Sequence, residues 1–191
     1  SLFGWSAFDE TRNVDFNTTV WIREEGNIVI DPMPMSDHDR AHLQALGGVA
    51  WVVMTNSDHI RSAQDVAEIF GAQLAGPAAE RSVWPFLCDA WLQDGDVLVE
   101  GLTALTCEGS KTPGELVLRL GSDTIVTGDL IRAHRAGHLM LLPDPKLSDR
   151  DAALRSVARI AAIEEIEAVL VGDGWPLFSG GHNALQALVS V

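Results

Sequence analysis

The stretch VVMTNSDHIRSA, residues 52–63, decides the fold because it combines a strand, a polar cluster and the start of a helix. Its apolar, strand-like part ends at Thr55 and Asn56, Asp58 and His59 follow, and a helical pattern then begins. Side chains able to bind a metal are thus delivered to the end of a strand, where open α/β sheets place their sites. The stretch therefore predicts a metal site, although one with a single histidine.

Length and composition favour one domain over residues 1–191, because 191 residues can build one substantial core. The apolar runs are too short to cross a bilayer, and the first residues lack the order of a signal peptide. We therefore expect a cytoplasmic protein without a membrane partner. Cys88 and Cys107 lie in unrelated segments, so two reduced thiols are favoured over one disulfide.

The charge of the chain bears on its partners. There are 13 Lys and Arg residues against 27 Asp and Glu, which gives a formal net charge of −14. Such a field repels phosphate backbones and anionic membranes, so nucleic-acid binding is not expected. A small-molecule substrate remains the expected partner.

The first half reads as a hairpin, a helix, a strand and a second helix. Residues 18–32 are rich in β-branched residues and turn at Glu25-Gly26. Ser36 and Asp39 form a capping box for a helix that stops at Gly47-Gly48. A strand at 49–54 is followed by a second helix over 61–72, which ends at Gly71. The apolar face of this helix comprises Ala63, Val66, Ile69 and Phe70.

The second half reads as a second antiparallel sheet followed by helices. Its strands lie in residues 96–109 and 115–131, and residues 132–147 read as a loop. Ser148 is expected to cap a helix over 149–163, a strand follows within 167–175, and residues 181–191 form a last helix. This order predicts two sheets packed face to face with helices outside.

Five ordered landmarks, IVIDP (28–32), TNSDHIRSA (55–63), KTPGEL (111–116), TGDLI (127–131) and VLVGDGW (169–175), resemble those of the metallo-β-lactamase superfamily. That family carries H-x-H-x-D-H after one strand, then a further His, a bridging Asp in a G-D turn and a last His. The resemblance covers nearly the whole chain. It implies an α/β (α+β) fold, the four-layer αβ/βα sandwich of that family.

The departures from the family pattern fall on the metal ligands. Met54 and Asn56 stand where the first two histidines belong or, in a shifted alignment, Asn56 takes the first place. Glu115 replaces the next histidine and Asp173 the last one, whereas Asp129 is unchanged. Both histidines of the first motif are therefore lost in either alignment.

The remaining set implies one divalent metal, Zn, Mn or Fe, at the family's second-metal position, held by Asp58, His59, Asp129 and Asp173. Three carboxylates converging without a cation would repel one another, which favours a bound ion. The alternative is that these residues only cap a helix or shape glycine-flanked turns.

The resemblance further implies a metal-dependent hydrolase that attacks a small ester, thioester, lactone or amide with a metal-activated water. Asp58 would orient that water, and Glu115 is a second candidate base. The alternative is a non-catalytic member that has lost its metals and serves a binding or structural role. The nuclease branch is disfavoured by the charge.

Cationic residues beside the bridging Asp are candidates for binding an anionic substrate group. For the loop over residues 132–138 the alternative is an exposed segment that pairs with surface acids, and for Arg61 and Lys111 it is that they merely neutralise the buried acids. The candidate substrate-binding residues are Asn56, Arg61, Lys111, Arg132, His134, Arg135, His138 and Trp175. His38 and His42 have the spacing of a zinc pair, but a solvated helix face is favoured for them.

Overall fold

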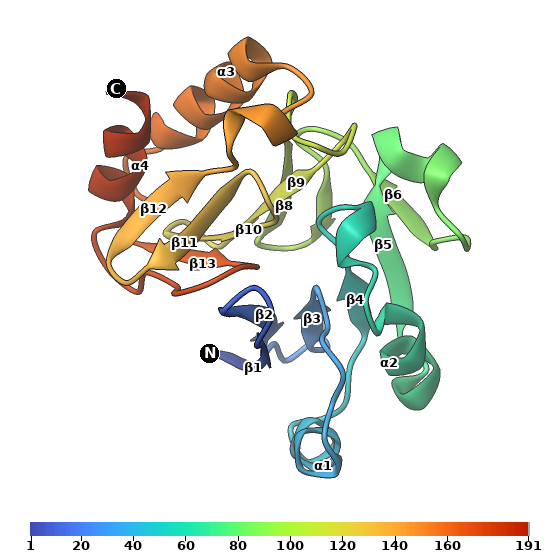
Figure 1. Ribbon diagram of the computed structural model, residues 1–191. Coiled ribbons are helices and arrows are strands. Elements are labelled where there is room, and N and C mark those ends of the chain that lie inside the picture. Colours follow the sequence, from blue (N-terminus) through green and yellow to red (C-terminus); the bar gives the residue numbers. More distant parts are fainter. Residues whose placement is uncertain (191) are drawn as a thin grey trace.

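A computed structural model describes residues 1–190 and contains two main sheets (Figure 1). The first has six strands in the order β1-β2-β3-β4-β5-β6. Strands β1 to β3 are antiparallel, and β3 to β6 run parallel. The bounds are β1 Leu2–Asp9, β2 Val14–Trp21, β3 Ile28–Ile30, β4 Trp51–Val53, β5 Gln73–Pro77 and β6 Ala90–Leu92.

The second sheet has the order β13-β10-β9-β8-β7. Its neighbours are antiparallel except β10 and β13, which are parallel. The bounds are β7 Val97–Val99, β8 Leu102–Thr106, β9 Leu116–Leu120, β10 Thr124–Thr127 and β13 Ala168–Val171. A separate hairpin pairs β11, Ile131–Arg135, with β12, His138–Leu141.

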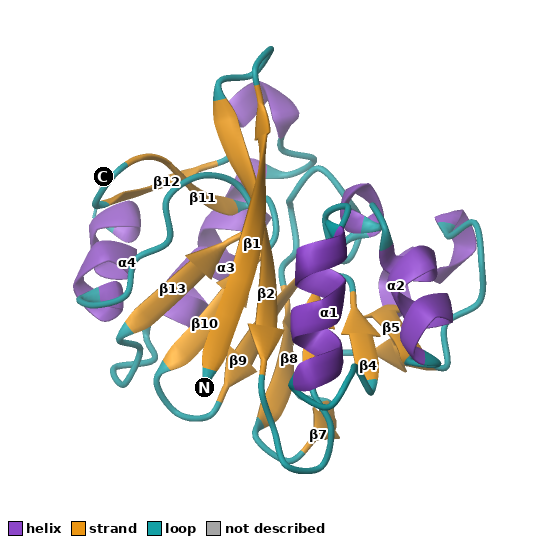
Figure 2. Cartoon of the chain, turned by 90° about the horizontal axis from the view of Figure 1, so that it is seen from below, coloured by secondary structure: helices purple, strands orange, loops and turns teal. Residues whose placement is uncertain are grey.

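Four layers follow from the alternation of apolar side chains in the buried strands. The helices are α1 Asp37–Ala45, α2 Ala63–Phe70, α3 Arg150–Ala161 and α4 Gly181–Val189. In β3, Ile28 and Ile30 pack between the sheets with Leu116 and Leu118, whereas Val29 faces the outer core with Leu43 of α1. The second sheet is covered by helices α3 and α4, so the order is helices, sheet, sheet, helices (Figures 1 and 2). The αβ/βα sandwich is thereby confirmed.

Local sequence signals account for several boundaries. Ser36 and Asp39 form the expected capping box of α1, and Gly71 ends α2 in the left-handed region at φ 67°. On α2, however, Ile69 is 44% exposed, and Ala67 is buried in its place. Both cysteines are buried and free, as favoured above.

Other expectations were wrong. Residues 132–147 contain β11 and β12 rather than only a loop, because Ile131 and Ala133 bury their side chains against the α3 side of the core. Helix α3 is capped by Asp149, whose side chain accepts from the amide of Ala152, and not by Ser148. Strand β1 was not predicted, because most of its side chains are exposed and it lacks a buried stripe.

No helix among residues 1–190 has the length and apolarity needed to cross a membrane. The final residue of the predicted last helix, Val191, lies outside the described residues.

Candidate functional site

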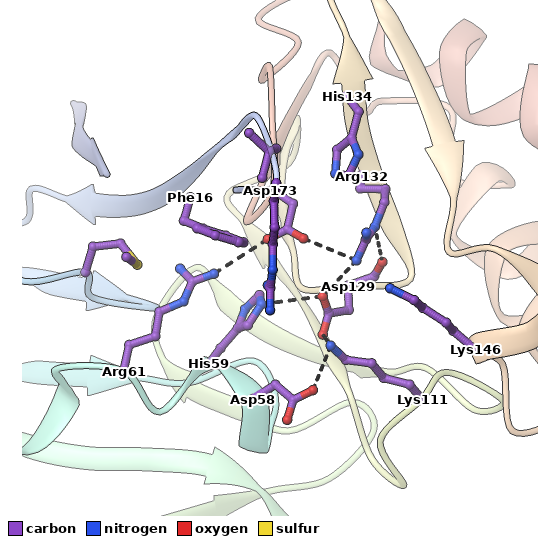
Figure 3. A pocket seen from close by; sticks show the side chains of 13 residues that line it. Phe16, Asp58, His59, Arg61, Lys111, Asp129, Arg132, His134, Lys146 and Asp173 are labelled. Atoms are coloured by element: carbon purple, nitrogen blue, oxygen red, sulfur yellow. Dashed lines mark hydrogen bonds and ion pairs between the residues drawn. The ribbon is translucent and has the colours of Figure 1, made fainter. Parts of the chain in front are cut away.

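The landmark residues meet where strands of both sheets end. Asp31 follows β3, the segment Thr55–His59 follows β4, Asp129 follows β10 and Asp173 follows β13. Because these strands deliver their carboxyl ends to one edge, side chains from the loops that follow them line a common cavity (Figure 3). Asp58, His59, Asp129 and Asp173 all line it, as expected from the order of the landmarks.

The segment after β4 is held by short-range hydrogen bonds. Thr55 donates from its backbone N and Oγ1 to the carboxylate of Asp31, at 2.8 and 2.6 Å. Asn56 caps a 3-10 turn, because its Oδ1 accepts from the amides of Asp58 and His59 at 3.0 and 3.1 Å. Asn56 is fully buried and lies outside the lining of the cavity; its Oδ1 supports the turn, and its Nδ2 donates to Asp129 Oδ2 at 3.3 Å.

His59 lies between two carboxylates. Its Nδ1 is 2.8 Å from Asp31 Oδ2, and its Nε2 is 3.6 Å from Asp129 Oδ1. Burial by itself lowers the pKa of His59, but the charge of Asp31 and the hydrogen bonds to Asp129 and Asp31 raise it to about 10. Ligand atoms of His59, Asp129 and Asp173 lie within 4.8 Å of one another. Asp58 is outside this group, and its side chain is 54% exposed.

Lys111 stands between two of the acids. Its Nζ is 2.7 Å from Asp58 Oδ2 and 2.9 Å from Asp129 Oδ2 (Figure 3). Although burial alone lowers the pKa of this amine, its hydrogen bonds to Asp129 and Asp58 raise it above the ordinary value. Lys111 therefore brings a positive charge to the centre of the acidic group.

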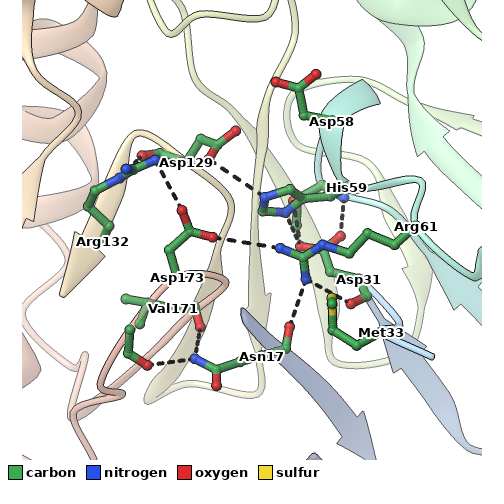
Figure 4. Close-up of polar contacts among 12 residues, drawn as sticks. Asn17, Asp31, Met33, Asp58, His59, Arg61, Asp129, Arg132, Val171 and Asp173 are labelled. Carbon is green, nitrogen blue, oxygen red and sulfur yellow. Dashed lines mark hydrogen bonds and ion pairs between the residues drawn. The ribbon is translucent and has the colours of Figure 1, made fainter. Parts of the chain in front are cut away.

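Two arginines neutralise Asp173. Arg132 Nη2 is 3.2 Å from Asp173 Oδ2 and 3.0 Å from Asp129 Oδ1. Arg61 Nη2 is 3.6 Å from Asp173 Oδ1, while its Nη1 donates to the carbonyls of Asn17 and Asp31 at 3.0 and 3.1 Å (Figure 4). The repulsion among these carboxylates, which was the argument for a bound ion, is relieved by Arg61, Lys111 and Arg132 of the chain itself.

Glu115 does not face the cavity. It is fully buried, and its Oε1 accepts from the backbone amides of Asp129 and Leu130 at 2.7 and 2.8 Å. Ser110 Oγ donates to its other oxygen at 2.5 Å. Burial and the nearby Asp129 raise the pKa of Glu115 to about 7, against the lowering by these hydrogen bonds. Its observed contacts position the turn that carries Asp129.

A second buried carboxylate, Glu80, was not predicted. Its oxygens accept from the amides of Ser57 and Gly114, at 2.6 and 3.1 Å, and so join the loop after β4 to the loop before β9. Both loops carry cavity residues, Asp58 and Lys111. Glu80 lies in no recognisable motif, and only the long-range contacts reveal its role.

The cavity has a volume of about 770 Å³. Of the predicted substrate-binding residues, Arg61, Lys111, Arg132 and His134 line it, whereas Arg135, His138 and Trp175 do not. The lining residues that were missed are Arg12, Val14, Phe16, Met33 and Lys146. Arg12 and Phe16 come from the β1–β2 hairpin, which no landmark identifies.

The donors His59, Asp129 and Asp173 form a compact set, yet they do not fit a divalent ion as they stand. Both oxygens of Asp129 are already in contact with Lys111 or Arg132, and Asp173 Oδ2 is in contact with Arg132. Within residues 1–190, Asp173 Oδ1 is a buried atom without a hydrogen-bond partner. One open oxygen and one imidazole nitrogen make an incomplete ligand set while Lys111 contacts Asp129.

Comparison with known proteins agrees with this architecture. The family model described as the metallo-beta-lactamase superfamily matches residues 1–191, and the chain belongs to that superfamily. Members of the superfamily bind divalent metals such as zinc or iron. A search of curated protein sequences finds no match.

Solved structures show the shared fold at low identity. The metallo-beta-lactamase DIM-1 has 17% identity and a TM-score of 0.76, over 99% of this chain and 91% of that one. A metallo-beta-lactamase from Pontibacter korlensis has 13% identity and a TM-score of 0.76, with coverages of 99% and 92%. TTHA1623, solved in a di-iron-bound form, has 19% identity and a TM-score of 0.70, with coverages of 94% and 96%.

Proposed function

We propose that the cavity binds a small molecule that carries an anionic group such as a carboxylate. One observation carries this proposal: five of the 13 Lys and Arg residues of a chain with net charge −14 line this one cavity. They include both lysines of the sequence, Lys111 and Lys146. Concentrated positive charge in a cleft attracts anionic ligands and raises their local concentration.

The five cations divide into an inner and an outer set. The inner set, Arg61, Lys111 and Arg132, is paired with Asp58, Asp129 and Asp173. The outer set is Arg12 and Lys146. The guanidinium of Arg12 has a 3.9 Å contact with Asp9 at an exposed position and lies over the Phe16 ring, 5.6 Å from its centroid, and Lys146 has no ion pair among residues 1–190. The outer set therefore retains charge for a ligand.

The other walls favour a ligand with an apolar part. Val14, Phe16 and Met33 line the same cavity, and its volume is in the range of small-molecule sites. His134 adds a polar group, and burial together with the charge of Arg132 lowers the pKa of its imidazole. A neutral imidazole can donate one hydrogen bond and accept another.

The second candidate is metal-dependent hydrolysis of a small ester, thioester, lactone or amide. The convergence of His59, Asp129 and Asp173 favours it, as does Asp31 on the other nitrogen of His59, since metal-binding histidines usually make such a bond. One Zn, Mn or Fe ion would be held by these three residues. This function requires Lys111 to withdraw from Asp129.

Binding of matched small molecules tests the first proposal. Small carboxylates and their neutral amides are titrated calorimetrically into the protein and into Lys146→Met. We expect the carboxylates to bind more tightly than the amides and to lose about tenfold in affinity in the variant, which corresponds to about 1.4 kcal/mol. Arg40→Met, at an exposed position on α1, is the control for net charge. Equal losses in both variants, or equal binding of acids and amides, would contradict the proposal.

A further inference from the structure

The centre of the acidic group is occupied by side chains of the protein itself. Lys111 Nζ contacts Asp129 Oδ2 at 2.9 Å, and Arg132 Nη2 contacts Asp129 Oδ1 at 3.0 Å, so both oxygens of the family's bridging Asp have a cationic partner (Figure 3). Arg132 Nη2 also reaches Asp173 Oδ2 at 3.2 Å. One guanidinium thus joins two of the three members of the candidate donor set.

The two cations differ in how firmly they are held. The Arg132 side chain is only 9% exposed, and its Nε donates to the carbonyl of Asp129 at 3.1 Å. The Lys111 side chain is 32% exposed and ends in a single ammonium. Arg132 is therefore a fixed part of the turn, whereas Lys111 is the cation that can exchange with another.

Charge balance sets the cost of adding a metal. Asp58, Asp129 and Asp173 are matched by Arg61, Lys111 and Arg132, which leaves this group of six side chains neutral. A divalent ion would add two positive charges beside two resident cations, of which Arg132 is almost fully buried. Such an ion is favourable only if a resident cation leaves.

We propose that Lys111 and Arg132 have replaced the divalent metal of the family as the electrostatic centre of this site, so that the protein folds and keeps its cavity without a metal. Lys111 is the exchangeable member of the pair, and its removal opens the position to a metal ion. This inference stands independently of the anionic ligand proposed above, because it concerns the acids rather than the outer cations.

A variant of Lys111 tests the inference, and the same substitution at Lys146 is the control. The protein, Lys111→Met and Lys146→Met are compared by thermal unfolding with and without Mn²⁺, and by equilibrium dialysis followed by metal analysis. All three carry His42→Gln, because the rings of His38 and His42 lie 6.3 Å apart on α1 and could bind metal at the surface. Lys111→Gln replaces Lys111→Met if the latter does not fold.

We expect the protein and Lys146→Met to retain no Mn²⁺ after dialysis and to show the same Tm with and without it. Lys111→Met should lose on the order of 5 °C in Tm, since it leaves Asp129 with one cation fewer. Mn²⁺ should restore most of that loss, and the restoration should vanish when Asp129→Ala is added. Restoration shows that a metal takes the place of the ammonium.

Three results would overturn the inference. The first is one equivalent of Mn²⁺ bound by the protein with Lys111 in place, together with a rise in Tm that Asp129→Ala removes. The second is an unchanged Tm in Lys111→Met. The third is a destabilised Lys111→Met variant that Mn²⁺ does not restore. Loss of anion binding in Lys146→Met is a separate measurement and does not bear on these results.

Discussion

Arg132 contacts Asp129 through two different atoms, with Nη2 at 3.0 Å from Oδ1 and Nε donating to the backbone carbonyl at 3.1 Å. The residues are three apart, so this double contact closes the turn between β10 and β11 on itself. The same guanidinium extends to Asp173 beyond β13. A short-range turn and a long-range ion pair therefore depend on one side chain.

Arg132→Met is expected to lower the free energy of unfolding by about 3–5 kcal/mol, because it leaves two buried carboxylates with one cation fewer. Urea denaturation measures the change. The control is Arg159→Met, which breaks a pair with Asp94 whose side chains are 46% and 49% exposed. That exposed pair should contribute about 0–1 kcal/mol. Similar decreases in the free energy of unfolding in the two variants would show that the Arg132 contacts stabilise the protein no more than an exposed ion pair does.

The raised pKa of Glu115 predicts that the free energy of unfolding decreases as the pH rises. Its pKa is raised from 4.5 to about 7 in the folded state, so the folded protein binds this proton more tightly than the unfolded chain. This proton contributes roughly 3 kcal/mol to the free energy of unfolding. The contribution is complete below pH 4.5 and is lost as the pH rises through about 7.

Glu115→Gln is the matched variant for that pH dependence. Its amide oxygen can still accept from the backbone amides of Asp129 and Leu130, and its NH₂ can donate to Ser110 Oγ. Urea denaturation between pH 4.5 and 8 should give a flatter profile for the variant. Parallel profiles for the two proteins would assign the pH dependence to other groups.

His59 should remain protonated through neutral pH. With its pKa at about 10, its contribution to stability is complete below pH 6.5 and is lost as the pH rises through about 10. Imidazole resonances followed by NMR should show no titration of His59 between pH 6 and 8. In Asp31→Asn, which removes the acid 2.8 Å from Nδ1, the pKa should fall. Titration near pH 6.5 in the unaltered protein would refute the assigned charge.

Glu80→Ala is expected to cost about 2–5 kcal/mol, because it leaves the amides of Ser57 and Gly114 without an acceptor. Glu80→Gln keeps one acceptor and should cost less. Hydrogen exchange checks the mechanism, since the amides of Ser57 and Gly114 should lose protection in Glu80→Ala first. Unchanged protection of these two amides would exclude the bridging role.

The fold was predictable because its signals are local and ordered along the chain. The capping box of Ser36 and the glycine after α2 set helix boundaries within a few residues, and the continuous apolar run Ile28–Ile30 is typical of a strand buried on both faces. The β11–β12 hairpin was missed, because its burial depends on helices that follow it in sequence.

The cavity was predicted less completely. The positions of His59, Asp129 and Asp173 follow from motifs at strand ends, but the partners of these residues do not. Lys111 reaches Asp58 across 53 residues of sequence, and no periodicity encodes that contact. Arg12 lines the cavity from the β1–β2 hairpin. Strand β1 is mostly exposed, so its sequence has no alternation of apolar residues that would predict the hairpin.

Both lysines of the sequence line the same cavity, and this has a practical consequence for chemical labelling. Reagents that acylate amines can modify lysine side chains at only these two positions, besides the N-terminal amine, so the mass added at lysine in peptide mapping reports directly on access to the cavity. Lys111 is held between two carboxylates and has a raised pKa, so it should react more slowly than Lys146. A ligand that fills the cavity would protect both amines, which makes the unmodified protein its own probe of occupancy.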